Sequence, residues 1–157
     1  YVLAALKYAK KMGCKTASVC CNKEALSFNY SDYPIFVDVG PEIISGSTRL
    51  KSGTAEKMVL NMLTTVSMIK LGLVYDNYMV NLMPTNIKLE NRAKMLIKKI
   101  TNCSDSDIEN VWLNSSKSVT AAVLMIMYHI DGKKAHETLQ KVNNNLHLAI
   151  EELSKNK

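Results

Sequence analysis

Residues 39–63 read Val-Gly-Pro-Glu-Ile-Ile-Ser-Gly-Ser-Thr-Arg-Leu-Lys-Ser-Gly-Thr-Ala-Glu-Lys-Met-Val-Leu-Asn-Met-Leu. The pair Gly40-Pro41 predicts the end of a strand, because proline cannot donate to a sheet ladder. A loop of small and hydroxyl-bearing residues follows as far as Thr54, and it contains Arg49 and Lys51. Beyond the loop, apolar residues recur with the spacing of a helix that buries one face. They are Met58, Val59, Met62, Leu63, Val66 and Ile69.

The loop before this helix is suited to binding an anion. A Gly/Ser/Thr-rich segment that leads into a helix offers backbone N–H groups and the positive end of the helix dipole. Arg49 and Lys51 would add charge-assisted hydrogen bonds. The alternative is that the hydroxyl residues only cap the helix, and composition alone favours that reading. The spacing matches neither a Walker A loop nor a dinucleotide-binding fingerprint.

On the N-terminal side, the pattern alternates between helix and strand. We expect a helix over residues 1–12 that ends at Gly13, a buried strand over 16–20, an irregular segment with one helical turn over 22–33, and a strand over 35–39. This alternation indicates an α/β sheet with parallel strands. Ligands of such sheets bind beyond the carboxyl ends of the strands, where Asn22 and the loop from Gly46 to Gly53 are both expected.

On the C-terminal side, the long helix is expected over residues 52–71, with Gly72 as its stop. Residues 73–83 predict a short strand or an irregular arm, and Thr85 or Asn86 caps a further helix. After residue 103 we expect four short helices in two similar hairpins, because an apolar pattern repeats at a constant offset of 27 residues. The first copy comprises Trp112, Val119, Ala122, Val123 and Ile126, and the second comprises Leu139, Leu146, Ala149, Ile150 and Leu153.

Composition narrows the functional classes. The 157 residues carry a net charge of +6, but the basic residues are scattered and show no arginine-rich or aromatic stripe, so we expect no nucleic-acid partner. The four cysteines and three histidines lack zinc-site spacing, so we expect no metal and no cofactor. No apolar run predicts a membrane span. The chain starts at Tyr1 inside a helical pattern without a cap, which we interpret as the sign of a fragment.

The motifs resemble a known enzyme family. Gly40-Pro41-Glu42, the run over residues 46–55 and the run over 57–63 are similar to the N-acetylmuramic acid 6-phosphate etherases, members of the sugar isomerase (SIS) domain superfamily. The resemblance also takes in residues 13–16, 20–22, 72–80 and 85–89, and thus in effect the whole chain.

This resemblance implies a fold and a domain organisation. Residues 1–83 would form the C-terminal half of a SIS domain, which is a flavodoxin-like, three-layer αβα fold with a parallel sheet. Residues 84–103 would be a connecting helix. Residues 104–157 would be an all-helical tail of the ubiquitin-associated (UBA) type, which we expect to act as a small bundle packed on the sheet domain rather than as a ubiquitin-binding module.

The resemblance also implies a reaction. The family is a class of carbon–oxygen lyases that cleave the D-lactyl ether of N-acetylmuramic acid 6-phosphate, giving N-acetylglucosamine 6-phosphate and D-lactate in amino-sugar catabolism and peptidoglycan recycling. The family's two catalytic glutamates lie in the N-terminal half, so no residue of this chain is expected to be catalytic and the fragment is expected to be inactive alone. Glu42, before the loop, and Glu56, which is expected in the first turn of the long helix, are the possible substitutes, and neither is expected to be catalytic.

Substrate binding is the remaining role. In the related sugar-phosphate-binding regulators of glucokinase, a lysine in the matching block approaches the sugar phosphate, and Lys51 stands at that position. Ser47, Thr48 and Arg49 are expected as further contacts, and Glu42 as a contact to sugar hydroxyls. The resemblance further implies a cytoplasmic homodimer. The alternative function is a non-catalytic sugar-phosphate-binding regulator of the glucokinase-regulatory type.

Overall fold

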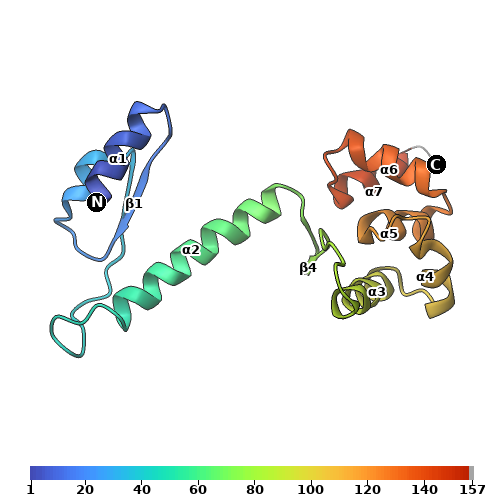
Figure 1. Cartoon of the computed structure of the whole chain (residues 1–157), viewed down its shortest axis with the longest axis horizontal. Coiled ribbons are helices and arrows are strands. Elements are labelled where there is room, and N and C mark those ends of the chain that lie inside the picture. The colour runs from blue at the N-terminus through green and yellow to red at the C-terminus, as the bar shows by residue number, and fades with distance from the viewer. Residues whose placement is uncertain (156–157) are drawn as a thin grey trace. The chain divides into compact units, whose positions relative to one another are not determined.

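The computed structural model describes residues 1–155 and contains helices, a parallel strand pair and an antiparallel hairpin (Figure 1). Packing divides the chain into two compact units, Tyr1–Thr64 and Thr65–Lys157, which are described separately below. The fold is thus of the mixed α/β class that the sequence predicts. Among the described residues, no helix has both the length and the apolar character that crossing a membrane requires.

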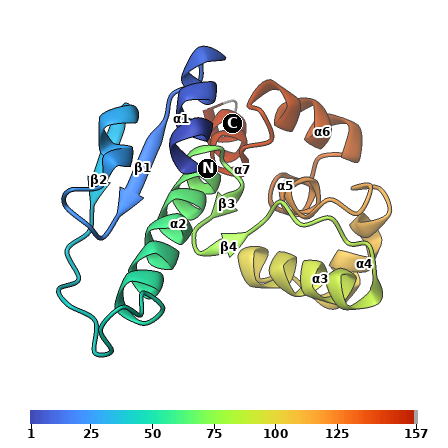
Figure 2. The same cartoon turned by 60° about the vertical axis from the view of Figure 1, so that its left-hand side comes forward.

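Unit 1 contains helix α1 (Val2–Lys11), strand β1 (Ala17–Cys20), the 3₁₀ helix η1 (Leu26–Tyr30) and strand β2 (Tyr33–Phe36). The strands pair in parallel with Ala17 opposite Tyr33 and Cys20 opposite Phe36, and they run side by side in Figure 2. The entry to β2 is fixed by Asp32, whose carboxylate accepts hydrogen bonds at 2.8 Å from both the backbone N–H and the hydroxyl of Thr16.

Two expectations for this sheet were wrong. The second strand was expected over residues 35–39, but β2 begins at Tyr33 and ends at Phe36. It ends there because β1 itself ends at Cys20, so the ladder finishes with the bond from Val37 N–H to Cys20 O. The first strand was expected to be buried, yet only Ser18 of β1 is buried, because a sheet of two strands leaves most of its surface uncovered.

Helix α2 spans Lys51–Lys70, as predicted to within one residue, and crosses from unit 1 into unit 2. Its expected buried face was the larger error, since none of its residues is buried. Met58, Met62 and Ile69 are 53%, 56% and 52% exposed. Periodicity correctly identified an apolar stripe, but a stripe becomes buried only where another element packs on it.

Unit 2 begins with a hairpin of strands β3 (Val74–Tyr75) and β4 (Tyr78–Met79). Helix α3 (Ile87–Thr101) follows, and the Asn86 side chain caps it by accepting the N–H of Leu89 at 2.9 Å. The remaining helices are α4 (Asp105–Trp112), α5 (Val119–Tyr128), α6 (Gly132–Lys141) and α7 (Leu146–Lys155). Helix α5 packs against α3, α4, α6 and α7 and forms the centre of the core (Figure 2).

The predicted repeat is present in the backbone of unit 2. Helices α4 and α6 start at side-chain caps from Ser104 and Asp131, which are 27 positions apart, and Ser118 and Asn145 cap α5 and α7 at the same offset. The turn inside each hairpin has two consecutive residues with φ near 53° and 60°, namely Ser116-Lys117 and Asn143-Asn144. The two hairpins thus share one local geometry. Positions 156 and 157 of the predicted tail lie outside the described residues.

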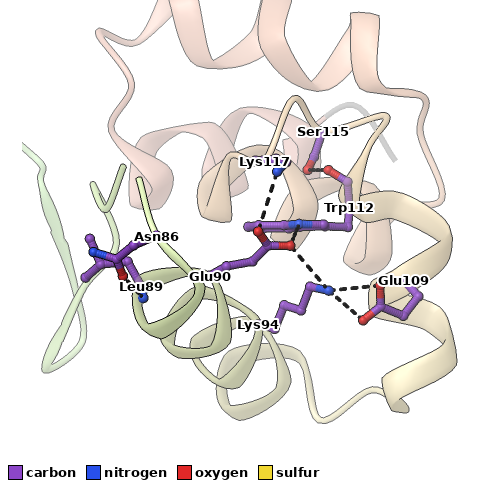
Figure 3. Close-up of polar contacts among 8 residues, drawn as sticks. All are labelled: Asn86, Leu89, Glu90, Lys94, Glu109, Trp112, Ser115 and Lys117. Carbon is purple, nitrogen blue, oxygen red and sulfur yellow. Dashed lines mark hydrogen bonds and ion pairs between the residues drawn. The ribbon is translucent and has the colours of Figure 1, made fainter. Parts of the chain in front are cut away.

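A polar network holds α3 and α4 together at the edge of this core (Figure 3). The Trp112 indole donates from Nε1 to Glu90 Oε1 at 2.8 Å, and Glu90 also faces the Nζ atoms of Lys94 and Lys117 at 3.6 and 3.5 Å. Lys94 in turn forms an ion pair with Glu109 at 2.7 Å. Trp112 is only 2% exposed, so its ring belongs to the core while its one polar atom finds an acceptor.

Candidate functional site

Unit 1 contains a cavity at the carboxyl end of β1. Its volume is about 290 Å³, and it is lined by Cys20, Cys21, Asn22, Thr48, Ser52 and Glu56. Cys20 is the last residue of β1, and Cys21 and Asn22 follow it. Thr48 comes from the loop, and the last two residues stand one turn apart on α2. The cavity therefore lies between the carboxyl end of β1 and the loop, which the sequence predicted to be neighbours. This is the position at which α/β sheets bind ligands.

The side chain of Glu42 caps the N-terminus of α2. Its Oε2 accepts the backbone N–H of Lys51 and its Oε1 accepts that of Ser52, both at 3.1 Å. These two bonds lower the pKa of Glu42, with smaller contributions from the Ser52 hydroxyl and the Lys51 charge. The backbone N–H groups of this turn were expected to be free to bind an anion, and for Lys51 and Ser52 that expectation is wrong. A carboxylate at a helix N-terminus satisfies the same N–H groups and the same dipole as an external anion.

The loop between Glu42 and α2 is held by its own backbone. Ser47 N–H donates to Ile44 O at 3.0 Å, and Gly53 N–H donates to Thr48 O at 2.9 Å. A Cβ atom on Gly53 would approach Thr48 O to 3.3 Å, which is closer than most such contacts, so a larger residue at this position would press on the loop backbone. Thr48 is thereby kept beside the first turn of α2, where it lines the cavity.

The two cations of the loop differ in their surroundings. Lys51 Nζ donates to Pro41 O at 2.8 Å, so the lysine bridges the loop to the segment after β2. Arg49 is exposed, and within residues 1–155 it pairs with no carboxylate. Of the five predicted binding residues, the structure brings Glu42 and Lys51 together and places Thr48 at the cavity. Ser47 and Arg49 belong to the same loop but are not among the lining residues.

Other lining residues were not among the predicted contacts. Ser52 and Glu56 are four residues apart on a helix, a spacing that puts them on one face and that the sequence already displays. Asn22 Oδ1 accepts the N–H of Glu24 at 3.0 Å, which leaves its amide NH₂ as a donor. Cys20, which ends the strand that was expected to be buried, and the following Cys21 are both half-exposed, and both line the cavity.

Comparison with known proteins gives a consistent result. The chain is 43% identical over 150 residues to N-acetylmuramic acid 6-phosphate etherase 2 of Lactiplantibacillus plantarum, a match that covers 96% of this chain and 51% of the relative. It is 46% identical over 145 residues to etherase 2 of Enterococcus faecalis, covering 92% and 48%. It is 44% identical over 143 residues to the etherase of an Exiguobacterium species, covering 91% and 49%.

No protein-family model matches the chain. The chain spans about half the length of the curated relatives it matches. In sequence, it corresponds to the C-terminal half of the N-acetylmuramic acid 6-phosphate etherases.

Proposed function

We propose that this chain supplies the substrate-holding half of an N-acetylmuramic acid 6-phosphate etherase. The observation that supports the proposal most directly is the cavity of unit 1, where Thr48 and Ser52 meet Asn22 at the carboxyl end of β1. This geometry occurs in a chain whose relatives, 41% to 48% identical, bear the etherase name. Hydroxyl and amide donors at such a position suit the oxygen-rich surface of a sugar phosphate.

The roles of the loop residues in this proposal follow from their contacts. Arg49, which has no carboxylate partner among the described residues, and Lys51 provide the positive charge for the phosphate. Thr48 donates a hydrogen bond from the cavity wall, and Ser47 contributes from the half-buried base of the loop. Glu42 holds the start of α2, and because each carboxylate oxygen can accept more than one bond, it also accepts a sugar hydroxyl.

The reaction requires a general base next to the lactyl carboxylate and a general acid at the ether oxygen. We propose that both groups come from the half of the etherase that this chain does not match, as the family's two glutamates imply. Glu56 lines the cavity, but the expectation that it lies in the first turn was wrong, because α2 begins at Lys51 and Glu56 falls in its second turn. We assign it to substrate contact rather than to proton transfer.

The finer architecture belongs to the same proposal. The parallel pair of β1 and β2 with its flanking helices is compatible with half of a three-layer SIS domain over residues 1–83. The paired hairpins after residue 103 are compatible with a UBA-like tail, and α3 (Ile87–Thr101) would connect the two parts. We also propose that the complete enzyme is a cytoplasmic homodimer that binds neither nucleic acid nor membrane.

A chimera tests the function. This chain replaces the matching half of the Lactiplantibacillus plantarum etherase, and D-lactate release from N-acetylmuramic acid 6-phosphate is measured against the parent enzyme. The proposal is supported if the chimera releases more D-lactate than does the part of the parent etherase that this chain does not replace, measured by itself. Binding of the sugar phosphate without turnover supports the regulator alternative. A folded chimera that neither binds nor turns over the substrate contradicts both. The 157-residue chain by itself should release no D-lactate.

A further inference from the structure

Unit 2 contains a cavity that none of the roles above uses. Its volume is about 520 Å³, and it lies among the β3–β4 hairpin, the last turn of α3 and the start of α7. The lining residues are Tyr75, Asp76, Tyr78, Lys99, Ile100 and His147, none of which lines the cavity of unit 1. The volume is within the range typical of small-molecule sites.

Three aromatic rings form part of the wall. Tyr75 and Tyr78 are register partners in the hairpin, so their side chains project on the same face. The ring of His147 lies beside that of Tyr75, with centroids 6.4 Å apart and planes inclined by 44°. Both tyrosines are half-buried and pack against the core of unit 2, which fixes their positions.

Four polar groups that line this cavity have no partner among the described residues, whereas His147 Nε2 lies 3.2 Å from Glu151 Oε1. Within residues 1–155, Asp76 and Lys99 form no ion pair, and neither tyrosine hydroxyl has a hydrogen-bond partner. The neighbouring Lys98, by contrast, pairs with Asp105 at 2.8 Å. The cavity therefore presents one free cation, one free carboxylate and two free phenols around aromatic surface.

We propose that this cavity is a second binding site, for a monosaccharide that carries an anionic group. Tyrosine rings pack against the C–H face of a sugar while their hydroxyls bond to its rim. Asp76 accepts from sugar hydroxyl or amide groups, and Lys99 supplies a point charge for a carboxylate or phosphate. Ile100 is the one aliphatic residue of the lining, so the cavity does not suit an apolar peptide side chain.

Titration calorimetry on the full 157-residue chain tests the site. N-acetylmuramic acid and N-acetylglucosamine 6-phosphate should bind to the chain. Neutral N-acetylglucosamine should bind with an affinity lower by about tenfold or more, and inorganic phosphate alone should give no signal. Lys99→Gln should weaken both anionic sugars about tenfold or more and leave the neutral sugar unchanged. Lys88→Gln, an exposed position on the same helix, is the matched control and should change nothing.

Asp76→Asn provides a second, independent variant. Asp76 has a φ of 53°, a conformation that asparagine also tolerates, so the hairpin should persist while all three sugars lose affinity. Far-ultraviolet circular dichroism checks that each variant is folded. The proposal is overturned if no sugar binds at about 10 mM, or if Lys99→Gln and Lys88→Gln behave alike. It is also overturned if Lys51→Ala abolishes binding and Lys99→Gln does not, because that result assigns the ligand to unit 1. D-lactate release by the chimera is a separate readout, so the two proposals can fail independently.

Discussion

Trp112 and Glu90 are joined by a 2.8 Å hydrogen bond that links α4 to α3 across 22 residues of sequence (Figure 3). The indole is 2% exposed and packs in the core, and Lys94 Nζ lies 5.7 Å from the ring centroid. Trp112→Ala should therefore destabilise unit 2 by about 3–5 kcal/mol, the usual cost of removing a large buried ring. Urea denaturation followed by far-ultraviolet circular dichroism measures the loss.

The conservative variant separates packing from hydrogen bonding. Trp112→Phe keeps most of the apolar volume but removes the donor to Glu90, so it should cost about 1–3 kcal/mol. If the Phe variant were as unstable as the Ala variant, the hydrogen bond rather than the buried area would dominate this contact.

Asp32 should make the stability of unit 1 depend on pH, with a loss of stability at low pH. Hydrogen bonds from the backbone and hydroxyl of Thr16, with Lys10 nearby at 3.1 Å, lower the pKa of Asp32 from 3.8 to about 2. A lowered pKa in the folded state means that the stabilisation is complete above about pH 4 and is lost as the pH falls towards about 2. Asp32→Asn should flatten this dependence. Amide exchange of residues 17–20, measured between pH 5 and pH 2, is the readout.

Thr16→Val is the matched control for this titration, because it removes the hydroxyl donor and keeps the backbone donor. The loss of protection between pH 5 and pH 2 should be smaller in this variant than in the wild type and larger than in Asp32→Asn. If amide exchange in Asp32→Asn increased over the same pH range as in the wild type, another group would control the acid sensitivity.

Gly72 and Asn145 should be coupled. Gly72 follows α2 with a φ of 75°, and a Cβ atom there would clash with Asn145 Nδ2 and lie 2.7 Å from Asn145 Cβ. Asn145 caps α7 through the N–H of Leu148, so Gly72→Ala combines backbone strain with the loss of a cap. We expect a loss of about 2–4 kcal/mol, measured by chemical denaturation. In the double variant with Asn145→Ala, the cost should be less than the sum of the two single variants, and additivity would refute the coupling.

Glu42 should control the start of α2. Because its carboxylate accepts the N–H groups of Lys51 and Ser52, Glu42→Ala should accelerate hydrogen exchange of these two amides, and lowering the pH through the depressed pKa of Glu42 should do the same in the wild type. Glu42→Gln should have a smaller effect, since its amide oxygen still accepts one bond. Glu56→Gln is the control on the same helix, and equal exchange in Glu42→Ala and Glu56→Gln would rule out the cap.

Lys51 gives a direct test of the loop as a phosphate site. In the chimeric etherase, Lys51→Ala should weaken binding of N-acetylglucosamine 6-phosphate by about 1.5–3 kcal/mol, the range for a hydrogen bond to a charged group. The loss should shrink for N-acetylglucosamine, which has no phosphate. Calorimetry on both ligands is the measurement. Equal affinity in wild type and variant would leave Lys51 with its observed bond to Pro41 O and no role in binding.

The sequence alone determined the elements that depend on local signals. Ser104, Ser118 and Asn86 each start a helix through their own side chains, and the 27-residue repeat appears again in the caps and turns of the two hairpins. These features depend on residues within a few positions of one another, so local chemistry is enough to predict them.

The tertiary structure decided the features that depend on distant residues. Periodicity predicted the apolar stripe of α2 but not its exposure, because burial requires a partner that the pattern does not specify. The strand limits followed from the length of β1, and the carboxylate on the α2 N-terminus came from Glu42, nine and ten residues away from the N–H groups it accepts. Such features form only where segments distant in sequence pack against one another: cavities, helix caps from remote side chains, and the lengths of strand ladders. A local sequence pattern does not specify which distant segments will pack together.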